Sequence, residues 1–225
     1  MTAIAYDKGY FFLRLLEKTV GRETFDAFLK NYFESNAFTV MDTERFIDYL
    51  KTNLLNTNAL LSAVDLEAWI YGPGLPDNCP RVRSMRIENV DSTLAAWTTG
   101  ELTTAELPWN DWVYQERYRF LSNLDDNIPA MRLAELDAAY AITQTGNNEV
   151  LFAWLEQAVR SQYTPCYDRL ESFLVQVGRR KFLTPLYRAL LETGQKNRAE
   201  TIYAKARPNY HSVATSTMDE LLGME

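Results

Sequence analysis

The stretch YTPCYDRLESFLVQVGRRKFLTPLYRALLETG, residues 163–194, decides the fold class of this chain. It predicts one helix at 163–177 and another at 179–192. Gly178 alone separates them, and Gly194 follows the second. Glycine favours turns because it enters backbone conformations that other residues avoid. Helices joined by so short a turn are expected to lie antiparallel and side by side.

More helices of the same kind are expected around this hairpin. Apolar residues recur at helical spacing in four further ranges, 104–124, 131–143, 149–160 and 195–206. Turn-forming sequences at 125–129 and 146–148 separate most of them. Stacked helical hairpins form solenoids of the HEAT or armadillo kind. No residue-level repeat is visible, so this all-α prediction rests on the spacing of the helices.

Shorter amphipathic helices are expected in the first third of the chain. Their apolar stripes lie in the ranges 8–20, 23–34 and 64–71. Gly21 is expected to end the first of them. One more helix is expected to follow Asp42 or Thr43, since either side chain can cap a first turn.

A change of texture separates these helices from the later ones. Residues 72–80, GPGLPDNCP, hold three prolines and two glycines, which predicts a linker or a rigid crossing loop. The next residues, 82–90, fit a short strand or an extended segment. We therefore divide the chain into residues 1–72, a linker at 73–90, and a helical domain at 91–225.

Composition excludes several classes of protein. The chain has 225 residues, 47% of them hydrophobic, and a formal net charge of -7. An acidic chain without a long basic run is a poor nucleic-acid binder. No apolar run approaches the roughly 18 residues that a membrane span needs, and the first residues carry no signal-peptide pattern. We expect no nucleic acid, no membrane span and a cytoplasmic location.

Metal and disulfide chemistry have little support in the residues. His211 is the only histidine, whereas a catalytic zinc site usually takes three protein ligands, commonly histidines. We expect no metal ligands in this chain and His211 in a packed or surface position. A disulfide between Cys79 and Cys166 is possible, but two free thiols in a reducing or neutral compartment are favoured.

Two groups of side chains are candidates for chemistry. Tyr6, near the start of the first helix, could donate a hydrogen bond to an oxyanion, or it could simply cap a core. Arg179, Arg180 and Lys181 begin a helix after Gly178, where charge and free N–H groups attract an anion. The alternative for these three is a solvated basic turn, and residue chemistry alone favours both simpler interpretations.

Four stretches together resemble the M1 family of zinc aminopeptidases, in its leukotriene A4 hydrolase branch. Residues 5–13, AYDKGYFFL, resemble the family's Pro-Tyr-Glu-Lys-Gly-Phe segment. Residues 69–76, WIYGPGLP, look like its Trp-Leu-Tyr-x-Pro-Gly-Leu-Pro. Residues 178–187, GRRKFLTPLY, are similar to its Gly-Arg-x-Lys-Phe-x-x-Pro-Leu-Phe, and residues 210–214, YHSVA, to its Met-His-Pro-Val-Thr. The four occur in the branch's order with compatible spacing.

The resemblance implies a role for three residues. It implies that Tyr6 stabilises the tetrahedral intermediate and that Arg179 and Lys181 hold the carboxylate of a short peptide. Arg180 fills the family's variable position and receives no role. Ala5 and Asp7 stand where the family has Pro and Glu, two departures that leave the phenol in place.

The resemblance also implies a domain plan. Residues 1–72 would be the last helices of a thermolysin-like catalytic domain, and 91–225 a helical solenoid. The zinc ligands, His-Glu-x-x-His plus a later Glu, would then lie upstream in the parent protein. We expect the chain to be a fragment of a zinc metalloaminopeptidase, to pack on the rest of its catalytic domain, and to be inactive by itself.

Two other interpretations stay open at this point. The chain could be a non-catalytic helical interaction or scaffold domain, or part of a degenerate aminopeptidase relative. The gene upstream of Met1 would separate them, by showing an intact, damaged or missing zinc motif. The preferred N-terminal residue of the substrate, any epoxide hydrolase activity and the oligomeric state are not predicted.

Overall fold

The computed structural model describes residues 4–81, 83–126 and 128–224. Within those residues every regular element is helical, and no strand occurs. This confirms the predicted all-α fold. The chain forms two compact units, Met1–Arg83 and Ser84–Glu225. The assignment of the first unit to a catalytic domain remains a prediction.

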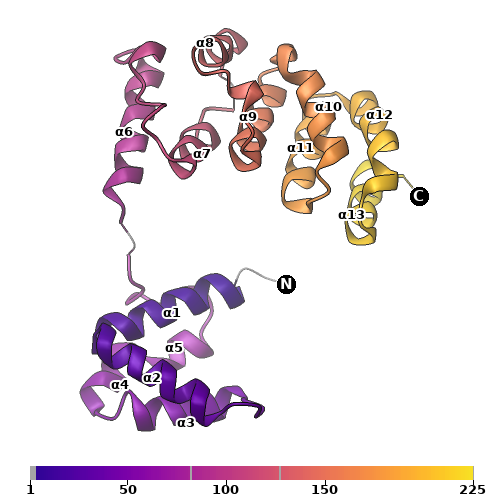
Figure 1. Ribbon diagram of the computed structural model, residues 1–225. Coiled ribbons are helices and arrows are strands. Elements are labelled where there is room, and N and C mark those ends of the chain that lie inside the picture. The colour runs from indigo at the N-terminus through magenta and orange to yellow at the C-terminus, as the bar shows by residue number, and fades with distance from the viewer. Residues whose placement is uncertain (1–3, 82, 127, 225) are drawn as a thin grey trace. The chain divides into compact units, whose positions relative to one another are not determined.

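The described residues of unit 1 form five helices (Figure 1): α1 (Ile4–Val20), α2 (Arg22–Ser35), α3 (Thr43–Asn53), α4 (Asn58–Val64) and α5 (Leu66–Ile70). Their caps are local. Asp42 accepts from the N–H of Arg45, and Thr57 accepts from that of Leu60. The sequence prediction missed α4 and began the next helix at Val64, which instead ends α4. Asp65 separates α4 from α5 in a left-handed conformation.

Gly21 ends α1 as predicted. Its φ is +85°, a backbone conformation that side chains disfavour, and its N–H donates to the carbonyl of Glu17 at 2.9 Å. The helices on either side then fold onto one small core. The apolar side chains at its centre are almost fully buried: Leu16, Phe28, Leu50, Leu55, Val64 and Trp69.

The Pro/Gly-rich loop lies against the helices of unit 1 rather than hanging free. The Asn78 amide donates to the carbonyls of Ala63 and Val64 at 2.9 and 3.1 Å. Its oxygen accepts from the indole N–H of Trp69 at 2.8 Å. Carbonyls at a helix end need such partners. One asparagine therefore joins the end of α4, a side chain of α5 and the loop.

The structure at residues 85–99 differs from the prediction of a strand or extended segment at 82–90. The segment expected to be a strand or extended is the start of α6 (Met85–Thr99), while residue 82 lies outside the described residues. Val90 and Trp97 are buried about two turns apart on one face. Ion pairs from Arg86 to Glu116 and from Asp91 to Arg119 join α6 to α7 (Tyr114–Ser122). The helix was missed because its apolar stripe extends well past residue 90.

The prediction of one helix at 104–124 is also wrong. Only Thr104–Glu106, a 3-10 turn, and α7 are helical there. Pro108 lacks an N–H and interrupts the helix, and Glu116 reaches back to accept from the N–H of Val113 at 2.9 Å, which starts α7. Trp109 and Trp112 fill the core from the intervening loop.

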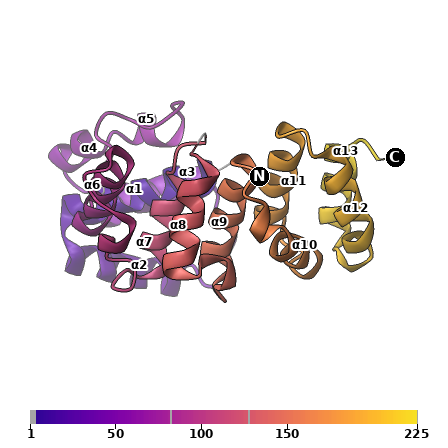
Figure 2. The ribbon, with the colours of Figure 1, turned by 90° about the horizontal axis from the view of Figure 1, so that it is seen from above.

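Unit 2 is a two-row stack of helices (Figure 1). Helix α7 packs on α9 (Asn148–Arg160), α9 on α11 (Arg180–Glu192), and α11 on α13 (Ser212–Leu222). In the other row α10 (Tyr167–Gln176) packs on α12 (Lys196–Ala206), and Figure 1 shows α8 (Ala130–Tyr140) in line with them. Figure 2 shows the helices of this unit lined up from α6 at one end to α12 and α13 at the other. Helix α13 had not been predicted.

The two cysteines are free, Cys79 half-buried and Cys166 buried. Burial raises the pKa of the Cys166 thiol to about 12, which keeps it protonated and unreactive at neutral pH. None of the described helices combines the length and apolar character that crossing a bilayer requires.

Candidate functional site

Tyr6 lies in the first turn of α1, because the helix begins at Ile4, four residues before the predicted start. Its side chain is 70% exposed. Tyr10 and Leu13 follow one and two turns later and are also exposed, whereas Phe12 and Leu16 face the core. The phenol is therefore presented outward on a rigid element, and the core-capping alternative does not describe it.

Lys8 anchors that first turn. Its ammonium donates to the carbonyl of Gly72 at 2.6 Å and to that of Ala68 at 3.3 Å. Gly72 follows α5 so closely that a Cβ there would lie 2.7 Å from the Ala68 carbonyl oxygen. The sequence reasoning missed Lys8. Its signal was available, since this lysine belongs to the same motif as Tyr6.

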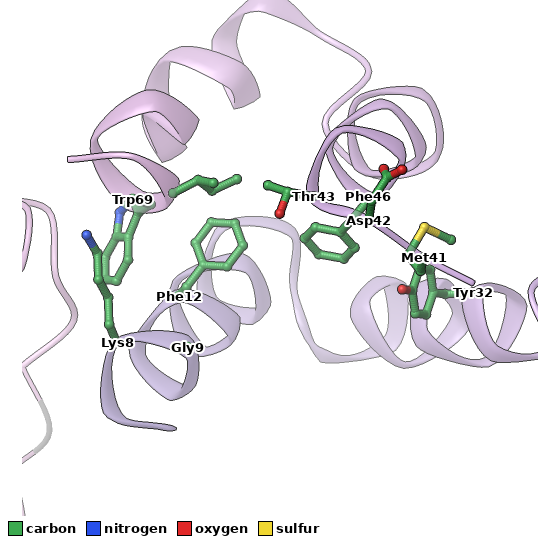
Figure 3. A pocket seen from close by; sticks show the side chains of 10 residues that line it. Lys8, Gly9, Phe12, Tyr32, Met41, Asp42, Thr43, Phe46 and Trp69 are labelled. Carbon is green, nitrogen blue, oxygen red and sulfur yellow. The ribbon is translucent and has the colours of Figure 1, made fainter. Parts of the chain in front are cut away.

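A pocket of about 600 Å³ opens beside Lys8 (Figure 3). Lys8 and Trp69 stand at one end of it, and Tyr32, Met41 and Phe46 at the other. The Lys8 ammonium is engaged with carbonyls, and the carboxylate of Asp42 caps α3. Most of the other side chains that line the pocket are apolar. Both charged side chains of the lining, Lys8 and Asp42, make contacts that stabilise the fold.

The three cations before and within α11 point to different partners. Arg179 is the residue that precedes the helix, and its guanidinium lies 5.5 Å from the centre of the Phe182 ring. The Lys181 ammonium lies 5.2 Å from the same ring and donates to both carboxylate oxygens of Glu149 at 2.6 Å. Arg180 turns away and donates to the hydroxyl of Thr217 on α13.

Phe182 fixes the position of this basic turn. Its ring is buried and packs against Phe152 of α9, at 5.2 Å between ring centres, and Phe173 of α10, at 5.7 Å. Arg179 and Lys181, three residues and one residue before Phe182 in the sequence, are exposed. The structure thus brings the two predicted carboxylate-holding residues onto one aromatic ring and separates Arg180 from them.

Tyr6 and this pair of cations lie in different units, Tyr6 in unit 1 and Arg179 with Lys181 in unit 2. Their roles remain predictions. His211 takes a surface position, where it precedes α13 and its Nδ1 accepts from the N–H of Val213 at 3.2 Å.

The residues that the structure describes do not fit a zinc ion. Among them no group of three or more His, Cys, Asp or Glu side chains is arranged to hold a metal. His211, the single histidine, is engaged as a cap.

Two family models match the chain. Residues 1–69 match the peptidase family M1 domain, and residues 112–222 match the carboxyl-terminal domain of leukotriene A4 hydrolase. The chain belongs to the M1 peptidase family. Both matches agree with the order of the four motifs, and the second identifies the leukotriene A4 hydrolase-like branch.

Curated relatives and solved structures agree with this family. Leucine aminopeptidase 2 of Pyricularia oryzae is 27% identical over 99% of this M1-family chain and 37% of its own length. A leukotriene A-4 hydrolase homolog of Botryotinia fuckeliana is 24% identical over 97% of the chain and 34% of its own length. Yeast leukotriene A4 hydrolase in complex with bestatin matches with a TM-score of 0.86 and 25% identity, over 99% of the chain and 39% of that structure. The chain thus spans under two-fifths of the length of these relatives.

Proposed function

We propose that this chain is the carboxyl-terminal part of a zinc metalloaminopeptidase that removes N-terminal residues from short peptides. The family assignment supports an M1 hydrolase as the parent. Zinc would be held by residues outside the chain. The observation that carries the proposal is the basic turn at the start of α11, where Arg179 and Lys181 share the Phe182 ring and Arg180 does not.

The proposed role of the cations is to hold the carboxylate at the far end of the peptide. A guanidinium can bind a carboxylate through two parallel hydrogen bonds, and an ammonium adds a point charge. A helix N-terminus adds N–H groups that favour an anion. Binding energy gained there fixes the position of the peptide at the reacting end, which limits the site to short peptides.

The proposed role of Tyr6 is to donate a hydrogen bond to the oxyanion that forms when the scissile carbonyl is attacked. Its place in the first turn of a helix that Lys8 ties to α5 supports this role, since a catalytic donor must be held rigidly. The exposure of Tyr6 leaves the phenol accessible to a substrate.

The exposed stripe of α1 supports contact with the rest of the catalytic domain. Tyr10 and Leu13 lie one and two turns beyond Tyr6 on the helix and are 49% and 41% exposed. Contiguous exposed apolar side chains mark interaction surfaces. A cytoplasmic location is part of the same proposal, and the two free thiols support it.

Arg179 and Arg180 make a matched pair for the test of the carboxylate site. In the full-length protein, Arg179→Ala should raise the Michaelis constant for a tripeptide about 10-fold or more, as the loss of a charged hydrogen bond predicts. It should change little for an aminoacyl anilide, which has no carboxylate. Arg180→Ala should leave both constants unchanged. Equal effects of Arg179→Ala on the two substrates would contradict the proposal.

A further inference from the structure

The ammonium of Lys181 is already bound to a carboxylate in this structure. Both carboxylate oxygens of Glu149 accept from it at 2.6 Å. Glu149 lies in the first turn of α9, and Lys181 lies in the first turn of α11, the helix that packs on α9. The side chains are 28% and 49% exposed, so the pair lies at the surface but is partly shielded.

The backbone around Glu149 is well fixed. Its N–H donates to the side-chain oxygen of Asn147, which precedes α9, at 3.0 Å. An acidic side chain in the first turn of a helix is also favoured by the helix dipole. Glu149 therefore stays at this position whether or not a ligand is present.

Arg179 differs from Lys181 in its ion pairing. Over the described residues 4–81, 83–126 and 128–224, no carboxylate lies within ion-pair distance of its guanidinium, which is exposed and lies over the Phe182 ring. Of the two cations on that ring, one is therefore available to an incoming anion and the other is neutralised from within the chain.

We propose that Glu149 determines the specificity of the carboxylate site, as an internal carboxylate that competes with the peptide for Lys181. This inference rests on the proposed function. An ammonium has three N–H donors, and Glu149 occupies two of them. The negative charge of Glu149 also repels a second carboxylate close by. Arg179 is then the main anchor, and Glu149 weakens the preference for peptides with a free carboxyl terminus.

The test compares a tripeptide with its carboxyl-terminal amide, in the full-length enzyme. Glu149→Gln keeps the size of the side chain and removes its charge. It should lower the Michaelis constant for the free acid about 2- to 5-fold, the range expected for one partly exposed charge pair. The constant for the amide should stay the same, because the amide carries no charge to be repelled.

Glu171→Gln is the matched control. It breaks a surface ion pair of the same length, from Lys205 to Glu171 at 2.6 Å, in a different part of the unit. It should change neither constant. In the Lys181→Gln background, Glu149→Gln should lower the Michaelis constant for the free acid by a smaller factor than in the unaltered enzyme, because only the repulsion between Glu149 and the peptide carboxylate is left to remove.

The outcomes are distinct. A higher Michaelis constant for the free acid in Glu149→Gln would mean that Glu149 holds Lys181 in place for the substrate, which overturns the inference. An unchanged ratio between acid and amide would overturn it as well. If Arg179→Ala and Lys181→Gln also leave this ratio unchanged, the carboxylate site itself is wrong, and the proposed function fails with it.

Discussion

The ammonium of Lys8, near the start of α1, donates a hydrogen bond to the carbonyl of Gly72 at 2.6 Å, across a sequence separation of 64 residues. It also reaches the carbonyl of Ala68 at 3.3 Å. Both carbonyls lie at the carboxyl-terminal end of α5, where a helix leaves carbonyls unpaired and its dipole is negative. The Lys8 ammonium thus links the start of α1 to the end of α5, and it fixes the first turn of α1, which carries Tyr6.

Lys8→Met should destabilise unit 1. Methionine keeps most of the volume but leaves two carbonyls without their partner, a loss of about 1–3 kcal/mol in the free energy of unfolding. Urea unfolding followed by circular dichroism would measure it. Lys30→Met is the control, because Lys30 is 74% exposed and its ion pair with Glu34 is long, at 4.0 Å. Equal transition midpoints for the two variants would show that the Lys8 contact contributes nothing.

Tyr6→Phe should lower the turnover of the full-length enzyme about 10²- to 10³-fold, with little change in the Michaelis constant. The variant removes one hydrogen-bond donor that acts on the transition state more than on the bound substrate. Steady-state kinetics on a tripeptide would measure both constants. Tyr10→Phe, one turn along the same exposed face, should retain near-normal turnover. Comparable turnover for Tyr6→Phe and the unaltered enzyme would remove Tyr6 from the mechanism.

Stability should fall in alkaline solution. Burial raises the pKa of Tyr203 to about 12, and its hydrogen bond to Asp219 acts in the same direction. An unfolded tyrosine loses its proton near pH 10. The folded state therefore keeps its full stability below about pH 10, and Tyr203 alone accounts for a loss of about 2–3 kcal/mol as the pH rises to about 12.

Tyr203→Phe should make this loss less steep, since phenylalanine has no proton to lose, while Tyr163 and Tyr210, whose pKa burial also raises to about 12, retain part of it. Thermal unfolding at several pH values between 9 and roughly 12 would measure the slope. Tyr114→Phe, at an exposed position, should leave the slope unchanged. If the Tyr203→Phe protein lost stability as steeply as the unaltered one, another group would control the alkaline transition.

The chain by itself should show no aminopeptidase activity. Its described residues offer no cluster of metal ligands, and its one histidine caps α13. An aminoacyl chromogenic substrate with added zinc is the direct assay, with buffer and zinc alone as the control. Turnover above that control would show that the chain holds a catalytic site that its side chains do not suggest.

The sequence determined the class of fold because helical signals are local. The three- to four-residue spacing of apolar side chains, together with Gly178 and Gly194, predicted both α11 and α12 to within one residue. Local signals failed where an interrupting residue had to be weighed against the apolar pattern. Pro108 interrupts the single helix predicted at 104–124. Residues 85–90, predicted to be a strand or extended, form the start of α6, whose apolar stripe extends past residue 90.

The sequence also indicated which residues to consider for function, since Tyr6, Arg179 and Lys181 stand in motifs of the M1 family. What these side chains contact was decided by tertiary structure. Neither the pairing of Lys181 with Glu149, 32 positions away, nor that of Lys8 with Gly72 has any local signal. Such contacts depend on which helices pack together, and the packing depends on how the whole apolar surface of each unit is buried.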